Sequence, residues 1–391
     1  MFSANAKLKQ LQYSVMSMSK LAVLSLALLL SSVALAQTPA AANPASQNDL
    51  AQAEKSWRLA VQHNPSDAKA LATLGFVLSK EQKYEEASAA YKKAITLDPK
   101  LPGVQLNLGL AEFKLGRFQA AVKPLEAALG AEPGNMQART LLGLSYYGAK
   151  RFEPAIEHLQ VASKADPDNM QLRQLLAQSC LWAKKYDCAL DEFKLIVQQD
   201  PDSAASHVLM GEALDGLSRT PEAIAEFEAA AKAAPREPNV HFGIGYLYWK
   251  QHKYDEAKAA FRDELAIEPN SPLALAYLGD ISMKERNSAE ALDFLTKAIK
   301  LKSDLRIAHL DTGIVLTEQK KYPEALAALQ RAEKLDPSQP DAHYRMGRVY
   351  TLMGNSAAAQ KEFDRVNQLH QKEEDDVAHR LSQAPPPLNP Q

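Results

Sequence analysis

The sequence predicts an all-α fold, a solenoid of stacked two-helix hairpins, and three observations predict it. First, proline recurs at a fixed spacing of 34 residues, with Ser303 at the one slot that lacks it: Pro65, Pro99, Pro133, Pro167, Pro201, Pro235, Pro269 and Pro337. Second, small residues recur at fixed positions of each period. Third, an apolar content of 46% with only 16 glycines favours helix. About 34 residues is the length of one helical hairpin with its loops, and such units stack on their neighbours.

The N-terminal residues 1–36 are predicted to be a secretory signal peptide. Lys20 precedes an apolar run that ends in Ala34-Leu35-Ala36, a small-x-small cleavage pattern. This run is about 16 residues long, whereas a membrane-spanning helix needs roughly 20. We therefore expect an exported protein, periplasmic or extracellular, with no membrane span after signal cleavage; an uncleaved anchor is the alternative. Residues 37–47 are rich in alanine and proline and predict a flexible linker.

Nine units follow when each is numbered so that its proline takes position 32. They begin at Ala68, Pro102, Met136, Met170, Ala204, Pro238, Pro272, Arg306 and Pro340. Position 8 is glycine in every unit except one, which has Ala177, and position 20 is alanine in all nine. A glycine inside a helix costs about 1 kcal/mol relative to alanine. Its recurrence predicts that two helices cross closely at this position, with large residues such as those at position 24 filling the hairpin around it.

The whole pattern resembles the tetratricopeptide repeat, with small residues at positions 8, 20 and 27, bulky residues at 7, 11 and 24, and proline at 32. The resemblance covers residues 68–373 without an insertion between units and implies a right-handed superhelical solenoid of about nine helix-turn-helix units. Residues 48–67 form a half repeat, predicted to be a helix that caps the N-terminal end. Residues 374–391 are expected to extend the last helix as a C-terminal cap and to end in a disordered proline-rich tail.

Charge and motifs exclude several classes of function. The formal net charge is -2, and it becomes more negative without residues 1–36, which hold three lysines and no acid. No basic stripe is present, so we expect no nucleic-acid binding. The sequence has no phosphate-binding loop, and Gly243-Ile244-Gly245 lacks the third glycine and the preceding strand of a dinucleotide loop. We expect neither catalysis nor a cofactor.

Four histidines share position 4 of their units: His207, His241, His309 and His343. They could form a row of metal ligands or proton carriers, or they could pack against a neighbouring helix. Equivalent positions in adjacent hairpins lie about 10 Å apart, whereas zinc needs nitrogens about 2.0–2.1 Å from one ion. Packing is therefore favoured, and no metal site is expected.

The two cysteines, Cys180 and Cys188, take positions 11 and 19 of one unit. These positions lie roughly opposite each other in an antiparallel hairpin, so an exported chain could join them in a disulfide. Position 19 is offset by about 100° from the inward-facing Ala189, however, and the pattern leaves the bond open.

The resemblance also implies where a partner binds. In tetratricopeptide proteins the first helix of each hairpin lines a concave groove through positions 2, 5, 9, 12 and 13. In the central units these positions hold Gln174, Gln178, Trp182, Glu212, Asp215, Phe242, Tyr246, Trp249, Asp280 and Met283. Aromatic rings flanked by acids and amides are typical of a protein- or peptide-binding groove. The alternative is that Tyr246 and Trp249 only cover the next hairpin.

Two further details concern this groove. The clamp that binds C-terminal carboxylates in some members of the family is absent, because position 9 of the first three units is Phe76, Leu110 and Leu144. Glu264 takes the small-residue position 27, where a carboxylate should cost several kcal/mol unless it is paired, hydrogen-bonded or partly solvated.

Together these patterns predict a non-catalytic scaffold in the cell envelope that binds a protein or peptide in its concave groove. The alternative is a structural assembly factor or subunit of an outer-membrane, pilus or polysaccharide-export complex, acting through its convex face. The oligomeric state stays open.

Overall fold

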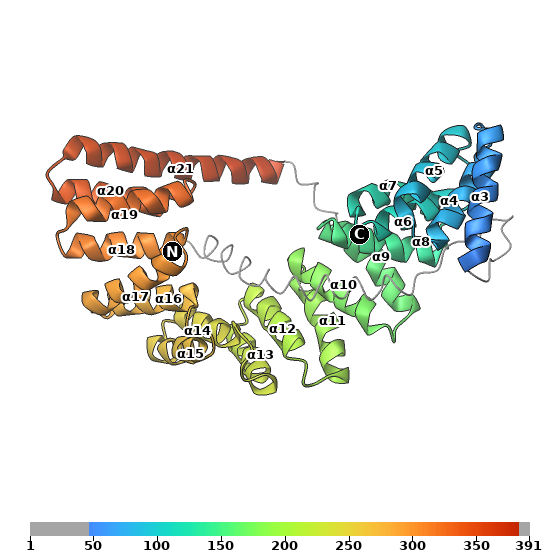
Figure 1. Ribbon diagram of the computed structural model, residues 1–391. Helices are drawn as coiled ribbons and strands as arrows, with labels where there is room; N and C mark the ends of the chain where they lie inside the picture. Colours follow the sequence, from blue (N-terminus) through green and yellow to red (C-terminus); the bar gives the residue numbers. More distant parts are fainter. Residues whose placement is uncertain (1–46, 383–391) are drawn as a thin grey trace, which may run out of the picture. The chain divides into compact units, whose positions relative to one another are not determined.

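The computed structural model describes residues 47–382, which form 19 helices, α3 to α21, and no strand (Figure 1). The predicted all-α fold of helical hairpins is confirmed. The predicted signal peptide, nearly all of the linker and the proline-rich tail from residue 383 lie outside the described residues. The chain divides into two compact units, and the boundary follows Glu226 inside α13. Each unit is described by itself.

The first unit begins with α3 (Gln47–His63) and continues with helices paired as hairpins. These pairs are α4 (Ala68–Lys80) with α5 (Tyr84–Leu97), α6 (Val104–Lys114) with α7 (Phe118–Ala131), α8 (Met136–Gly148) with α9 (Phe152–Ala165), α10 (Met170–Trp182) with α11 (Tyr186–Gln199), and α12 (Ala204–Gly216) with α13 (Thr220–Ala233).

The second unit continues the same pairing. Its hairpins are α14 (Val240–Lys250) with α15 (Tyr254–Ile267), α16 (Pro272–Lys284) with α17 (Ser288–Leu301), α18 (Arg306–Glu318) with α19 (Tyr322–Leu335), and α20 (Pro340–Leu352) with α21 (Ser356–Ser382). Within residues 47–382, no helix combines the length and the apolar character that crossing a membrane requires.

A contact between positions 8 and 24 holds each hairpin together. A Cβ added at Gly245 would lie 2.7 Å from the Phe261 ring, and one added at Gly75 would lie 2.7 Å from the Tyr91 ring. These distances are shorter than a carbon–carbon contact allows, so the recurring glycine is required by packing. The prediction drawn from the glycine period is confirmed.

One backbone motif makes every hairpin turn. The residue at position 15 has a φ between 58° and 77° in all nine turns: Gln82, Gly116, Lys150, Lys184, Ser218, His252, Arg286, Lys320 and Gly354. In the first turn, the Gln82 N–H donates to the Ser79 carbonyl at 3.1 Å and the Lys83 N–H donates to the Leu78 carbonyl at 2.9 Å. These two bonds satisfy carbonyls that the end of a helix leaves free.

Two first helices begin two residues later than the unit numbering suggests. Gly103 and Asn239, with φ of 74° and 70°, are the N-cap residues of α6 and α14. A residue in this left-handed conformation cannot belong to a right-handed helix. The helices therefore start at Val104 and Val240.

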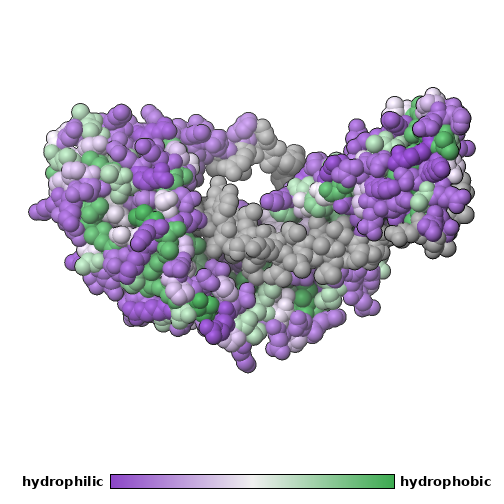
Figure 2. All heavy atoms as spheres, viewed as in Figure 1, coloured by the Kyte–Doolittle hydropathy of each residue, from purple (hydrophilic) through white to green (hydrophobic). Residues whose placement is uncertain are grey.

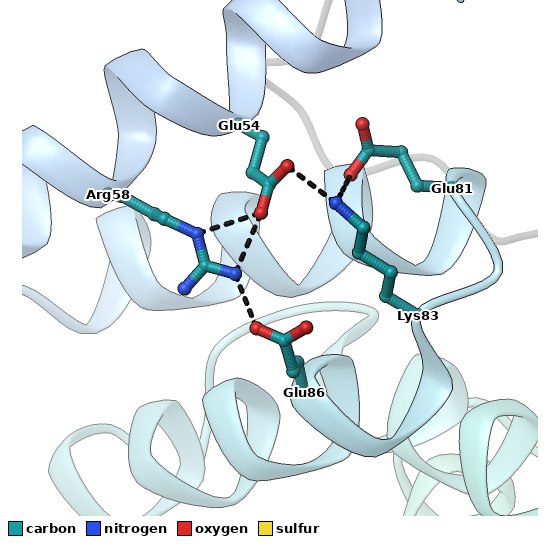
Figure 3. A network of polar contacts seen from close by, with 5 residues as sticks. All are labelled: Glu54, Arg58, Glu81, Lys83 and Glu86. Atoms are coloured by element: carbon teal, nitrogen blue, oxygen red, sulfur yellow. Dashed lines mark hydrogen bonds and ion pairs between the residues drawn. The ribbon is translucent and has the colours of Figure 1, made fainter.

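Helix α3 packs on the first hairpin through apolar and ionic contacts (Figure 3). Trp57 lies against the buried core of α4, α5 and α6. Lys83 donates a hydrogen bond to Glu54 at 2.7 Å, and Arg58 donates to Glu54 at 2.8 Å and also pairs with Glu86. The hydrogen bond from Lys83, with help from Arg58, holds the pKa of Glu54 below its ordinary value despite partial burial. The first hairpin is thus covered on its N-terminal side.

Candidate functional site

The ten predicted groove residues all lie on first helices, but they fall into two sets, one in each unit. Gln174, Gln178 and Trp182 are on α10, and Glu212 and Asp215 are on α12. Phe242, Tyr246 and Trp249 are on α14, and Asp280 and Met283 are on α16.

In the second unit the predicted aromatic residues meet one ring that the sequence analysis did not select, Tyr277 of α16. The Tyr277 ring centroid lies 5.1 Å from Trp249, 5.8 Å from Tyr246 and 5.7 Å from Phe242. All three pairs are edge-on, which is a favourable aromatic geometry. Tyr277 takes position 6 of its unit, one residue after groove position 5 and three residues before the predicted groove residue Asp280. An aromatic residue at this place was the sequence signal by which it could have been selected.

Asp280 fixes the orientation of the Trp249 indole. The indole Nε1–H donates to Asp280 Oδ2 at 2.5 Å, and Lys284 pairs with the other carboxylate oxygen. The Lys284 ammonium lies 5.6 Å from the Trp249 ring centroid, a distance at which a cation is attracted to the ring. Burial, with the neighbouring Tyr246 and Asp280, raises the pKa of Tyr277 well above its ordinary value, so its phenol stays protonated.

The predicted groove residues of this unit differ in how much of their side chain is exposed. Phe242 and Tyr246 are only 2% and 4% exposed, and both contact Tyr277 of the next hairpin. The alternative interpretation, that Tyr246 and Trp249 only cover the next hairpin, fits the contacts of Tyr246, and Phe242 is placed in the same way. Trp249 and Met283 are half-buried and are therefore the members of this set that keep exposed surface.

In the first unit, Gln178 and Trp182 belong to a second aromatic cluster. The Tyr147 hydroxyl donates to Gln178 Oε1 at 2.6 Å, and the Trp182 ring lies 5.6 Å from Tyr147 and 4.9 Å from Phe152. Burial raises the pKa of Tyr147, so its hydroxyl keeps the proton that it donates. Gln174 is half-buried one turn earlier on α10.

The two predicted acids of α12 lie less than one helical turn apart. Burial, together with the negative charge of Asp215, raises the pKa of Glu212 to about 8. Glu212 Oε1 has no hydrogen-bond partner among residues 47–382. Near neutral pH this carboxyl group is therefore mostly protonated and able to donate a hydrogen bond.

Two residues at position 4, Arg173 and His207, act as structural clamps. His207 places Nδ1 2.7 Å from Glu226 and Nε2 2.9 Å from the Pro201 carbonyl. In the preceding unit, Arg173 makes the same two contacts, with Glu192 at 2.7 Å and the Pro167 carbonyl at 3.3 Å. The clamp ties the loop between hairpins to the second helix. Among the described residues, no group of three or more potential ligands is placed to hold a metal ion.

A disulfide joins Cys180 of α10 to Cys188 of α11, with 5.7 Å between the two Cα atoms. Cys180 is fully buried and lies between Gln178 and Trp182 in the sequence. The bond therefore links the two helices of the hairpin that carries three of the five residues of the first predicted set.

Comparison with known families identifies the repeat. The model of the cytochrome c-type biogenesis protein H TPR domain matches residues 33–169, a tetratricopeptide repeat model matches 176–238, 208–272 and 242–305, and a TPR repeat model matches 313–354. The chain belongs to the tetratricopeptide repeat family.

Several solved structures align with this repeat protein, and one of them reaches a TM-score of 0.50. The APC/C hetero-tetramer Cut9-Hcn1 is 14% identical over 82% of this chain and 79% of that chain, with a TM-score of 0.50. YrrB, described as a TPR protein with an unusual peptide-binding site, is 22% identical over 45% of this chain and 91% of that chain, with a TM-score of 0.38. Yeast Tom70 is 15% identical over 86% and 94%, with a TM-score of 0.42. No curated protein sequence matches the chain significantly.

Proposed function

We propose that this repeat protein is a non-catalytic scaffold that binds a protein or peptide partner on the concave face formed by its first helices. The observation that carries the proposal is the Trp249 site. There, a half-buried indole is held by Asp280, flanked by Lys284 and supported by the buried ring of Tyr277. A rigid, partly exposed tryptophan beside a lysine is the kind of anchor that dominates protein interfaces.

The proposal also places the protein outside the cytoplasm, in the cell envelope. Support comes from the N-terminal sequence, where Lys20, the apolar run and Ala34-Leu35-Ala36 follow the order of a signal peptide. N-terminal sequencing of the protein recovered from the envelope fraction tests this part. A mature chain that begins at Gln37 supports export, and an intact N-terminus in a cytoplasmic fraction contradicts it.

The partner site is tested by photo-crosslinking in the cells that produce the protein. A photoreactive residue replaces Met283 on the first-helix face, and a matched probe replaces Arg262, an exposed residue on the second helix α15. We expect a dominant protein adduct from position 283 and none from position 262. The identified partner is then titrated against Trp249→Ala, which should weaken binding by at least tenfold. Unchanged affinity with an intact fold would refute the site.

A second candidate is an assembly factor held in an envelope complex through its convex face. The match of residues 33–169 to the TPR domain of a cytochrome c-type biogenesis protein favours it. In this case the adduct should form at position 262, and a stable complex should co-purify with the Trp249→Ala variant as well as with the native chain.

A further inference from the structure

The last helix, α21, is much longer than the other second helices. It has 27 residues, whereas α19 of the preceding hairpin has 14. Its first half packs along α20, since Phe363 fills the space beside Gly347 and its ring lies 6.1 Å from Tyr344. Its second half projects past the start of α20 (Figure 1). We call residues 371–382 the arm; at 1.5 Å per residue it extends roughly 18 Å.

Within the described part of this unit, α21 packs against α20. All side chains from Gln371 to Asp376 are exposed, and an unsupported helix of this length is only marginally stable in water. The arm carries four consecutive acids, Glu373, Glu374, Asp375 and Asp376, preceded by Lys372. Figure 2 shows mostly hydrophilic residues along the surface that α21 forms. The arm is therefore an acidic helix that packing against another chain would stabilise.

One exposed face of helix α20, which we call the stripe, is apolar and cationic, and this character complements that of the acidic arm. Tyr344, Arg348 and Leu352 are spaced by four residues and so lie on one face of the helix. Tyr344 is 46% exposed and Leu352 is 56% exposed, and Arg348 is exposed and makes no ion pair with the described residues. A second cation, Arg345, lies over the Tyr344 ring with its guanidinium carbon 5.9 Å from the centroid.

The stripe is exposed because α20 belongs to the last hairpin. At position 5, where α20 has Tyr344, the two preceding hairpins have Ala276 and Leu310, and both are buried. A terminal repeat exposes the face that a following repeat would cover. The apolar and cationic residues of this stripe, tyrosine and arginine above all, are those enriched at protein interfaces.

We propose that a second copy of this chain covers this face, with the arm of each copy lying on the Tyr344–Arg348–Leu352 stripe of the other. The pairing brings the four acids of one arm to Arg345 and Arg348 of the partner, and it does so twice, as a two-fold contact requires. The stripe runs over about 12 Å of helix, which an arm of roughly 18 Å covers. Tyr344 and Leu352 supply the apolar area, and the charges fix the register.

The experiment is sedimentation velocity on the full chain and on two charge-reversed variants. The first variant is Arg345→Glu with Arg348→Glu. The second replaces Glu373, Glu374, Asp375 and Asp376 with lysine. All six positions are half-buried or exposed, so circular dichroism should show native helix content in both variants.

We expect the native chain to dimerise and each variant alone to be monomeric, because like charges then face each other in both contacts. An equimolar mixture of the two variants should dimerise again, since each contact then joins acids to bases. A native chain that is monomeric at 100 times the concentration used for the variants overturns the proposal. A native dimer that both variants retain overturns it as well, and would place the contact elsewhere. Failure of the partner assay at Met283 leaves this result unaffected, because the two tests probe different helices.

Discussion

The carboxylate of Glu264 on α15 accepts a hydrogen bond from the backbone N–H of Asn239, 2.8 Å away, and its other oxygen accepts one from Phe242 at 3.1 Å. Asn239 is the left-handed N-cap of α14 and has no side-chain capping bond. The acid that the sequence left unexplained at a small-residue position thus caps the N-terminus of the other helix in its hairpin. Burial raises the pKa of Glu264, and the two N–H groups oppose this rise.

Replacing Glu264 with alanine should therefore destabilise the second unit. The change leaves two largely buried N–H groups without an acceptor, each at a cost of about 1–3 kcal/mol. We expect the free energy of unfolding to fall by about 2–4 kcal/mol, measured by urea denaturation followed by circular dichroism. Asp263→Ala, at the exposed neighbouring position of α15, is the control and should change stability by less than about 0.5 kcal/mol. Equal stability of the two variants would show that the cap contributes nothing.

Gly245→Ala should destabilise the same hairpin although alanine is the better helix former. The new Cβ would meet the Phe261 ring at 2.7 Å, and this ring is fully buried. Overpacking of this kind costs about 1–3 kcal/mol, against about 1 kcal/mol gained in helix propensity.

Gly130→Ala provides the matched control for that substitution. Gly130 is also inside a helix, α7, but a Cβ there has nothing within 4 Å. Thermal melts should show a lower Tm for Gly245→Ala and an equal or higher Tm for Gly130→Ala. A rise in Tm for both would mean that the glycine period has no role in packing.

The His207 clamp should make the first unit less stable as the pH rises. Burial lowers the pKa of His207, but the hydrogen bonds with Glu226 and the Pro201 carbonyl outweigh it, and the net shift is upward. A raised pKa in the folded state means that the contribution of this histidine is fully present below about pH 6.5. It is lost as the pH rises through the folded-state pKa.

The preceding unit supplies the control for this prediction, because Arg173 makes equivalent contacts and keeps its charge. His207→Arg should therefore remove part of the fall in Tm between pH 6 and pH 9 that the native chain shows. An identical pH profile for the variant and the native chain would rule out His207 as its source.

Reduction of the disulfide should loosen the α10–α11 hairpin. Cys180 and Cys188 are separated by 8 residues. Closing a loop of this length lowers the conformational entropy of the unfolded chain, which stabilises the folded state by about 2–3 kcal/mol. We expect a reductant to lower the Tm of the native chain but not that of Cys188→Ala. A native Tm that is unchanged by reductant would contradict the prediction.

The sequence predicts the structural features that recur in all nine units, but it does not predict the features that are confined to one or two of them. The hairpins and the packing role of glycine at position 8 follow from the period, since the same residue types return at the same positions. The partner of that glycine at position 24, Phe261 for Gly245, comes from the structure. The Glu264 cap occurs in one hairpin and the late helix start in two, α6 and α14. Both depend on the backbone conformation at the N-cap residue, Gly103 or Asn239, which no spacing reveals. Tyr277 was missed because it takes position 6, which is not one of the groove positions by which the site residues were selected. Tyr246 was selected by its position, although its ring is buried against Tyr277.

The turns between paired helices show what the repeats share when their residues differ. At position 15 the nine units use glycine, lysine, glutamine, serine, histidine and arginine, yet all nine hold the same left-handed conformation. The two backbone hydrogen bonds of each turn thus impose a conformation that most of these residues disfavour. The chain can therefore accept different residues at this position without altering the hairpin. Glycine adopts the left-handed conformation without strain, so replacing a non-glycine residue at position 15 with glycine would relieve strain in that turn. Gly116 and Gly354 are the two turns that already have glycine there.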